Sequence, residues 1–325
     1  MANNPFKAVG IIAGAALGVA SAAYGAQKII VRTLANTSVD FEFSVAEQFV
    51  LTTSDGTRLV LYRDGPRDKT KPTILFLHGY ALCSPIWAHQ FDLLRDTHDV
   101  IAMDLRGHGA SSVGEDGITL AAFADDVYET MNQLELEDVV LVGHSTGGVM
   151  AMSYLNRYAE HASHHVRGLC LVSTLAHPPY HHMENISEAL AKFSLTGHAF
   201  HFLSDIPLIG FPLARYALGN KASNAVVEFV RRCIVSTDRD VCIKVLQMLA
   251  EFNFLSTLEQ FVAPSAVIVG TSDPVTPLSD AEKVARALGT TEIIINGVGH
   301  CPMLESPDEF NTALIEFLDK TGEFL

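Results

Sequence analysis

The sequence predicts an α/β fold in which a mostly parallel sheet carries helices on both faces and a helical segment is inserted into the alternation. Short apolar runs typical of strands alternate with stretches of helical periodicity from about residue 45 to the C-terminus. Several of these runs end directly in loops rich in glycine or histidine. The 325 residues are 48% hydrophobic and 18% charged, so the chain can bury one large core or two smaller ones.

The strand predictions start with an antiparallel hairpin around the Asp55-Gly56 turn. The later segments are continuous apolar runs, which suit parallel strands that are buried on both faces. Functional loops of such a sheet lie at the carboxyl ends of its strands. In chain order the predicted strands are 49–52, 58–62, 73–77, 100–103, 139–142, 168–172, 266–269 and 292–295.

Helical periodicity predicts helices over 120–134, 148–158, 279–288 and 308–319. Residues 177 to about 258 break the alternation, because they combine helical periodicity and several prolines with no convincing strand. We therefore expect a helical cap. The predicted organisation is an N-terminal hydrophobic segment (1–35), a first part of the core (45–176), the cap (177–258) and a second part of the core (259–325).

Three short motifs supply a serine, a carboxylate and a histidine in that chain order. Ser145 lies in the turn Gly143-His144-Ser145-Thr146-Gly147, Asp273 follows Gly270-Thr271-Ser272, and His300 ends Gly297-Val298-Gly299-His300. A G-x-S-x-G turn between a strand and a helix is a nucleophile elbow, which exposes the serine hydroxyl. His300 is the expected general base, and Asp273 is expected to fix its tautomer. The sequence thus predicts a serine hydrolase.

Attack on a carbonyl also requires donors for the developing oxyanion. One is expected to be the backbone N–H of Thr146, directly after the nucleophile. The other is expected from the loop after the third strand, and we assign it to the N–H of Tyr80. His78, in the same loop, is expected to orient it through hydrogen bonds.

From about Phe49 to Leu325 the chain resembles the α/β-hydrolase superfamily. Besides the three motifs, the resemblance rests on the H-G-x turn at His78-Gly79-Tyr80 and on residues 104–111, which match the pattern D-x-R-G-x-G-x-S. It implies an eight-stranded sheet, a lid over the site, and no metal or organic cofactor. It also implies structural rather than catalytic roles for Asp104, Arg106 and His108.

Within that superfamily the serine at position 145 argues against epoxide hydrolases and haloalkane dehalogenases, which have an aspartate nucleophile. The short H-G-x loop is similar to that of monoacylglycerol lipases, small carboxylesterases and cofactor-free haloperoxidase-type perhydrolases. We expect a lipid-like ester as substrate, with a perhydrolase as the alternative enzyme and a non-catalytic ligand-binding module as the alternative from another class. The cap carries an apolar stretch suited to an acyl chain: Phe193, Phe200, Phe202, Leu203, Ile206, Leu208, Ile209 and Phe211.

Charge and cysteine content restrict other functions. The net charge of −15 repels phosphate backbones, so nucleic acid is not an expected partner. The cysteines are odd in number and scattered, so at least one thiol must be free and neither a disulfide framework nor a thiolate zinc site is expected. His177 and His181 are spaced like ligands on one helix face, but the intervening Pro178-Pro179 argues against that helix, and we expect no metal. The oligomeric state is open.

The N-terminal segment differs in composition from the rest of the chain, because residues 8–26 contain no charged side chain. As a helix they would span about 28 Å, close to the thickness of a bilayer core. Small residues recur four apart at Gly10, Gly14 and Gly18, a spacing that lets membrane helices approach. We therefore expect an N-terminal hydrophobic helix that anchors the enzyme to a membrane.

Two other interpretations of this segment stay open. With Lys7 before the apolar run and Ala20-Ser21-Ala22 as a cleavage site, it could be a signal peptide of a secreted enzyme. It could also be a soluble helix or tail. The flanking charges nearly balance, so they do not predict an orientation in the membrane.

Overall fold

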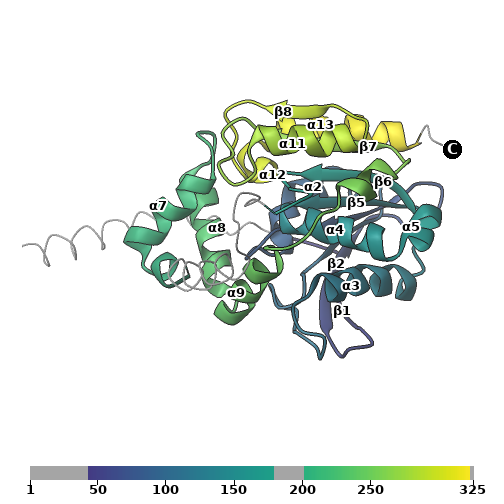
Figure 1. The fold of residues 1–325 in the computed structure, drawn as a ribbon, viewed down its shortest axis with the longest axis horizontal. Coiled ribbons are helices and arrows are strands. Elements are labelled where there is room, and N and C mark those ends of the chain that lie inside the picture. The colour runs from purple at the N-terminus through teal and green to yellow at the C-terminus, as the bar shows by residue number, and fades with distance from the viewer. Residues whose placement is uncertain (1–42, 179–200, 323–325) are drawn as a thin grey trace, which may run out of the picture.

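The computed structural model describes residues 43–178 and 201–322. Its centre is an eight-stranded sheet with the order β1-β2-β4-β3-β5-β6-β7-β8 (Figure 1). Strand β2 is antiparallel to both of its neighbours, and all other neighbouring strands are parallel. The mostly parallel, eight-stranded sheet is confirmed. The strands are β1 (Glu47–Thr52), β2 (Arg58–Asp64), β3 (Thr73–Leu77), β4 (Val100–Met103), β5 (Val139–His144), β6 (Val166–Val172), β7 (Ser265–Gly270) and β8 (Glu292–Ile295).

Strands β3, β4 and β8 have the predicted bounds, and the other strands are slightly longer than predicted. Alternate residues of each strand enter two separate cores. Leu75, Leu141 and Leu171 belong to the core on one face of the sheet, whereas Phe76 and Val142 belong to the core on the other face. Because both faces are covered, the inner strands read as continuous apolar runs rather than as alternating ones.

Helices from different parts of the chain cover the two faces. Helices α3, α4 and α11 contribute to the first core, and α2 and α13 contribute to the second. The sequence prediction missed α2 and α5, because α2 is short and α5 is a polar, histidine-rich segment in which Ala162 is the buried residue. The described helices outside the segment between β6 and β7 are η1 (Ser84–Trp87), α2 (Ala88–Leu94), α3 (Leu120–Gln133), α4 (Thr146–Arg157), α5 (Ala159–His165), α11 (Leu278–Ala287), α12 (Pro302–Glu305) and α13 (Pro307–Gly322).

Between β6 and β7 the described elements are helices. They are α7 (Pro207–Ala217), α8 (Asn224–Ser236), α9 (Arg239–Met248) and α10 (Leu255–Glu259). Figure 1 shows α7, α8 and α9 grouped at one end of the molecule, beside the sheet. We call residues 207–248 the α7–α9 segment. The N-terminal segment 1–35 expected from the sequence lies outside the described residues, as do Phe193 and Phe200.

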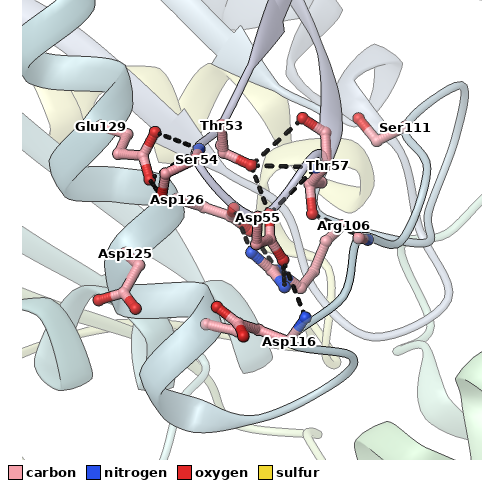
Figure 2. A network of polar contacts seen from close by, with 12 residues as sticks. Thr53, Ser54, Asp55, Thr57, Arg106, Ser111, Asp116, Asp125, Asp126 and Glu129 are labelled. Carbon is pink, nitrogen blue, oxygen red and sulfur yellow. Dashed lines mark hydrogen bonds and ion pairs between the residues drawn. The ribbon is translucent and has the colours of Figure 1, made fainter.

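A buried ion pair joins the entry hairpin to α3. The guanidinium of Arg106 donates to both carboxylate oxygens of Asp126 at 2.6 Å and to Asp55 at 3.1 Å, as Figure 2 shows. The side chains of Arg106 and Asp126 are each 1% exposed. A planar guanidinium matches a carboxylate through two parallel hydrogen bonds. These contacts fit the structural role expected for Arg106.

Replacing Arg106 by alanine should lower the free energy of unfolding by about 3 to 5 kcal/mol, because Asp126 would remain buried without a counter-charge. The matched control is Arg157→Ala, which breaks an exposed pair with Asp125 on the same helix as Asp126. That loss should be about 1 kcal/mol or less. Urea unfolding of the two variants measures both values, and equal losses would contradict the structural role of Arg106.

Candidate active site

The turn that carries Ser145 is strained in the way a nucleophile elbow requires. Ser145 has φ 50° and ψ −118°, between the end of β5 and the first residue of α4. A Cβ added at Gly147 would lie 2.3 Å from the carbonyl oxygen of Leu77, and one at Gly143 would lie 2.6 Å from the Cα of Gly148. Both motif glycines are therefore required by close backbone contacts.

Ser145, His300 and Asp273 form one chain of hydrogen bonds. Nε2 of His300 lies 3.0 Å from the hydroxyl oxygen of Ser145, and Nδ1 lies 2.9 Å from a carboxylate oxygen of Asp273. A neutral imidazole that donates from Nδ1 to Asp273 presents Nε2 as an acceptor for the serine proton. The structure thus brings together the three residues that the sequence motifs indicated.

Asp273 is fixed by further donors. The backbone N–H groups of Val275 and Thr276 donate to one carboxylate oxygen at 2.8 and 2.9 Å, and the Thr276 hydroxyl donates to the other. Burial opposes the charged form of Asp273, but the neighbouring His300 and the hydrogen bonds from Thr276 outweigh it and lower the pKa to about 2. Asp273 therefore stays a carboxylate at neutral pH and can stabilise an imidazolium.

The two residues expected to supply oxyanion donors lie beside Ser145. Tyr80 and Thr146 line the same cavity as Ser145 and His300. Thr146 is the first residue of α4, where backbone N–H groups have no partner within the helix. The N–H of Ser145 itself donates to the carbonyl oxygen of Val172 at 2.9 Å, so it is already used.

His78 orders the loop that carries Tyr80. Its Nδ1 lies 2.9 Å from the carbonyl oxygen of Gly79, and its Nε2 accepts a hydrogen bond from the N–H of Leu105 at 3.0 Å. These contacts connect the loop after β3 to the segment after β4. His78 therefore has the orienting contacts that its position in the sequence suggested.

Two residues that the sequence did not single out hold the backbone around His300. Nε2 of His144 lies 2.7 Å from the carbonyl oxygen of His300. The carboxylate of Glu305 accepts hydrogen bonds from the N–H groups of Gly299 and Cys301, both at 2.9 Å, and of Gly219 at 2.6 Å. Because Gly219 follows α7, Glu305 also connects the histidine loop to the α7–α9 segment.

Little in the sequence marked these two positions. His144 occupies the variable position of the G-x-S-x-G turn, and Glu305 is a single acid that follows Pro302-Met303-Leu304. An isolated acid in such an apolar turn is a signal for a buried carboxylate, since burial requires hydrogen-bond partners. The sequence does not say which N–H groups those partners are.

The buried histidines predict a loss of stability in acid. Burial lowers the pKa of His78 from 6.5 to about 4, and lowers those of His108 and His144 to about 3. Below pH 6.5 the unfolded chain binds these protons and the folded chain does not, so the free energy of unfolding should fall by up to about 4 kcal/mol per pH unit. Burial also raises the pKa of Asp126 to about 7 and that of Glu305, and these two carboxyl groups offset part of this fall.

Urea unfolding at a series of pH values measures this slope. The free energy of unfolding should fall as the pH drops from the ordinary histidine pKa towards about 4. A free energy of unfolding that stays constant across that interval would contradict neutral, buried histidines.

A cavity of about 510 Å³ opens over Ser145. This volume lies in the range of about 300 to 1,000 Å³ that is typical of small-molecule sites. The described residues that line it include no Asp, Glu, Lys or Arg, and most are apolar. Its apolar walls include Leu82, Val149, Leu175, Leu213, Val230, Ile234, Leu246, Leu249 and Phe252.

The described members of the apolar stretch predicted to receive an acyl chain do not line this cavity. Of its described members, Phe202 is 66% exposed and Leu208 and Ile209 are also exposed. The next residues of α7, including Leu213 and Ala217, contact the cavity instead. The apolar stretch therefore lies in the right part of the cap, but the residues of α7 that follow its described members contact the cavity.

No metal cluster and no membrane span was found in residues 43–178 and 201–322. No group of three or more His, Cys, Asp or Glu in these ranges is placed to hold a metal ion. No helix in them is both long and apolar enough to cross a bilayer. The expected anchor at residues 8–26 and His181 lie outside these ranges.

Comparison with known proteins shows which family the chain resembles in sequence. Residues 72–307 match the family described as alpha/beta hydrolase fold. A non-heme chloroperoxidase of Kitasatospora aureofaciens is 27% identical over 285 residues, which cover 83% of this chain and 99% of that protein. A bifunctional esterase/perhydrolase of Acinetobacter calcoaceticus is 42% identical over 110 residues, 33% of this chain and 39% of that protein.

A similar solved structure is that of a thermophilic esterase of Thermogutta terrifontis. It has a TM-score of 0.72 and 26% sequence identity, and the match covers 85% of this chain and 100% of that chain. The family match extends over more than half of the chain and includes Ser145, Asp273 and His300. The chain therefore belongs to the α/β-hydrolase fold family.

Proposed function

We propose that the protein is a serine hydrolase that cleaves carboxylic esters through an acyl-enzyme on Ser145. The observation that carries the proposal is the hydrogen-bonded chain from Ser145 through His300 to Asp273 at an apolar cavity. A relative named as a bifunctional esterase/perhydrolase and a similar structure named as an esterase support the same reaction class.

The geometry supports a two-step reaction. His300 takes the proton of Ser145 as the serine oxygen attacks the ester carbonyl, and the backbone N–H groups of Tyr80 and Thr146 stabilise the oxyanion. The alcohol leaves with the proton from His300. Water, activated by the same histidine, then attacks the acyl-enzyme and releases the carboxylic acid and Ser145.

We propose an uncharged, lipid-like ester such as a monoacylglycerol as the substrate. The apolar walls of the cavity favour an acyl chain, and a charged substituent would be desolvated there without a counter-charge. The cap of residues 177–258 would then supply much of the acyl contact, through residues such as Leu213, Val230 and Leu246.

A chain-length series of p-nitrophenyl esters, together with a monoacylglycerol, tests this substrate class. Val230→Phe, which narrows the cavity, should lower kcat/KM for a medium-chain ester by about 10-fold or more and should spare the acetate ester. The control is Val262→Phe at a position that is 85% exposed. A preference for charged or very short acyl groups in the wild type would refute the lipid-like substrate.

A perhydrolase is the second candidate, favoured by the relatives named chloroperoxidase and esterase/perhydrolase. In that reaction hydrogen peroxide replaces water as the acceptor of the acyl group and the product is a peracid. Measuring peracid and acid formation from one ester at increasing peroxide concentration separates the two. Peracid formation that is faster than hydrolysis at low peroxide would favour the perhydrolase. A folded protein that binds esters without turnover would instead favour the non-catalytic module.

We also propose that residues 8–26 attach the enzyme to a membrane. Their uncharged composition and length support this. Sequencing of the mature N-terminus and carbonate extraction of membranes test it. A mature chain that begins at Ala23 would instead indicate a cleaved signal peptide and a secreted enzyme.

A further inference from the structure

Two cysteines that are 150 residues apart in the chain lie against each other where the α7–α9 segment meets the core. Cys83 directly precedes η1, in the loop after β3, and Cys233 lies on α8. Their sulfur atoms are 3.5 Å apart. Both thiols are free in this structure. The odd number and wide spacing of the cysteines had argued against a disulfide framework, and neither reveals this contact.

The two sulfurs need only a small movement to bond. A disulfide has an S–S distance of about 2.05 Å, so the sulfurs would have to approach by about 1.5 Å. Cys83 has an extended backbone outside regular structure, whereas Cys233 is fixed on a helix. Cys83 is also the less buried of the two, since it is partly exposed and Cys233 is 5% exposed. An oxidant can therefore reach Cys83 first.

We propose that Cys83 and Cys233 form a reversible disulfide that ties α8 to the loop after β3. With hydrogen peroxide as the oxidant, the Cys83 sulfur attacks one peroxide oxygen, the O–O bond breaks, and one water and a sulfenic acid form. The Cys233 sulfur then attacks the sulfenic sulfur, the S–O bond breaks, and a second water leaves with the Cys233 proton. Two thiols are oxidised and one peroxide is reduced to two waters.

The rate of this oxidation should rise with pH. The hydrogen bond with Cys233 and burial raise the pKa of the Cys83 thiol, so the reactive thiolate is scarce at neutral pH. The bond should therefore form slowly at neutral pH and faster in mild alkali.

A disulfide between Cys83 and Cys233 would affect the cavity, because both cysteines lie next to residues of its wall. Leu82, next to Cys83, and Val230 and Ile234, on either side of Cys233 along α8, all line it. A covalent bond would fix the separation of these walls. This consequence rests on the proposed hydrolase function: oxidation should lower turnover of a medium-chain ester more than turnover of the acetate ester, because the longer chain needs more space between the loop and α8.

Peptide mapping of the full-length protein tests the bond without reference to activity. Trypsin cleavage places the five cysteines on five different peptides, with Cys83 on residues 70–95 and Cys233 on residues 233–239. After peroxide treatment, mapping without reductant should find these two peptides joined, with the loss of two hydrogen atoms, and dithiothreitol should separate them. The oxidised protein should also melt about 5 °C higher.

Variants make the test specific. Cys233→Ala and Cys83→Ser should each abolish both the joined peptide and the rise in Tm. The control Cys170→Ala, which removes a buried thiol of β6, should retain both. Peroxide that leaves the two peptides separate in folded wild type, or joins Cys83 or Cys233 to another cysteine, would overturn the proposal.

The activity measurement is compared with Cys233→Ala under the same peroxide treatment, because peroxide also oxidises methionines. The ratio of medium-chain to acetate turnover should fall in wild type, recover with dithiothreitol, and stay constant in Cys233→Ala. A ratio that is unchanged in cross-linked wild type would overturn the effect on the cavity. A cross-linked protein that hydrolyses no ester in either redox state would instead refute the proposed function and leave the disulfide standing.

Discussion

Replacing Ser145 by alanine should lower kcat for a p-nitrophenyl ester by about 10⁶-fold, because it removes the hydroxyl that is hydrogen-bonded to Nε2 of His300. The fold should be retained, since alanine keeps the Cβ and the hydroxyl contacts only His300 among the interactions found for it. His300→Ala should cost about as much, and the double variant should cost little more, because the two residues act as one unit. Initial rates at saturating ester, with circular dichroism as a check on folding, measure these effects.

Ser153→Ala is the matched control for this prediction. Ser153 lies on α4, like the residues that follow the nucleophile, but its hydroxyl donates to the carbonyl oxygen of Leu120 and it is not part of the cavity wall. Its kcat should stay near that of wild type. A Ser145→Ala protein that hydrolyses the ester within about tenfold of wild type would show that a different group carries the reaction.

Asp273→Asn should lower kcat by about 10⁴-fold through the tautomer of His300. The asparagine oxygen can still accept from the N–H groups of Val275 and Thr276, which leaves its NH₂ group facing Nδ1 of the histidine. A ring that must accept at Nδ1 carries its proton on Nε2, so it can no longer accept from Ser145. The effect should appear in kcat with a smaller change in KM.

The lowered pKa of Asp273 also predicts how the wild-type activity depends on pH. Because that pKa is lowered to about 2, the carboxylate stays charged in mild acid, and loss of wild-type activity there should not report the titration of Asp273. The control for the loss of kcat in Asp273→Asn is Asp280→Asn on α11. Asp280 is not part of the cavity wall and pairs with Lys283. Equal losses in the two variants would contradict the positioning role of Asp273.

Local sequence patterns were sufficient to predict the strands of the sheet and the position of the nucleophile. Strands β3 and β5 are continuous apolar runs because both of their faces are buried, and the glycines around Ser145 are required by backbone contacts that any such turn creates. Asp273 and His300 could be found because each follows a strand that ends at the same edge of the sheet. Chain order and strand position therefore predicted the candidate site.

Contacts between distant segments were not predictable in the same way. The carboxylate of Glu305 binds N–H groups on both sides of His300 and one after α7, and nothing in a single segment specifies that set. The contact of Cys83 with Cys233 likewise depends on how α8 packs on the loop after β3. The apolar stretch of the cap likewise did not reveal which of its side chains face inward: Leu213 lines the cavity, whereas Phe202 is exposed.

Labelling by a fluorophosphonate tests the central claim, a serine activated by His300 and Asp273, most directly. The reagent phosphonylates a serine only when a base takes its proton, and it needs no knowledge of the natural ester. We expect one adduct per folded chain, located at Ser145 by peptide mapping, no adduct in Ser145→Ala, and much slower labelling in His300→Ala. Folded wild-type protein that stays unlabelled, or labelling that persists unchanged in Ser145→Ala, would contradict the mechanism.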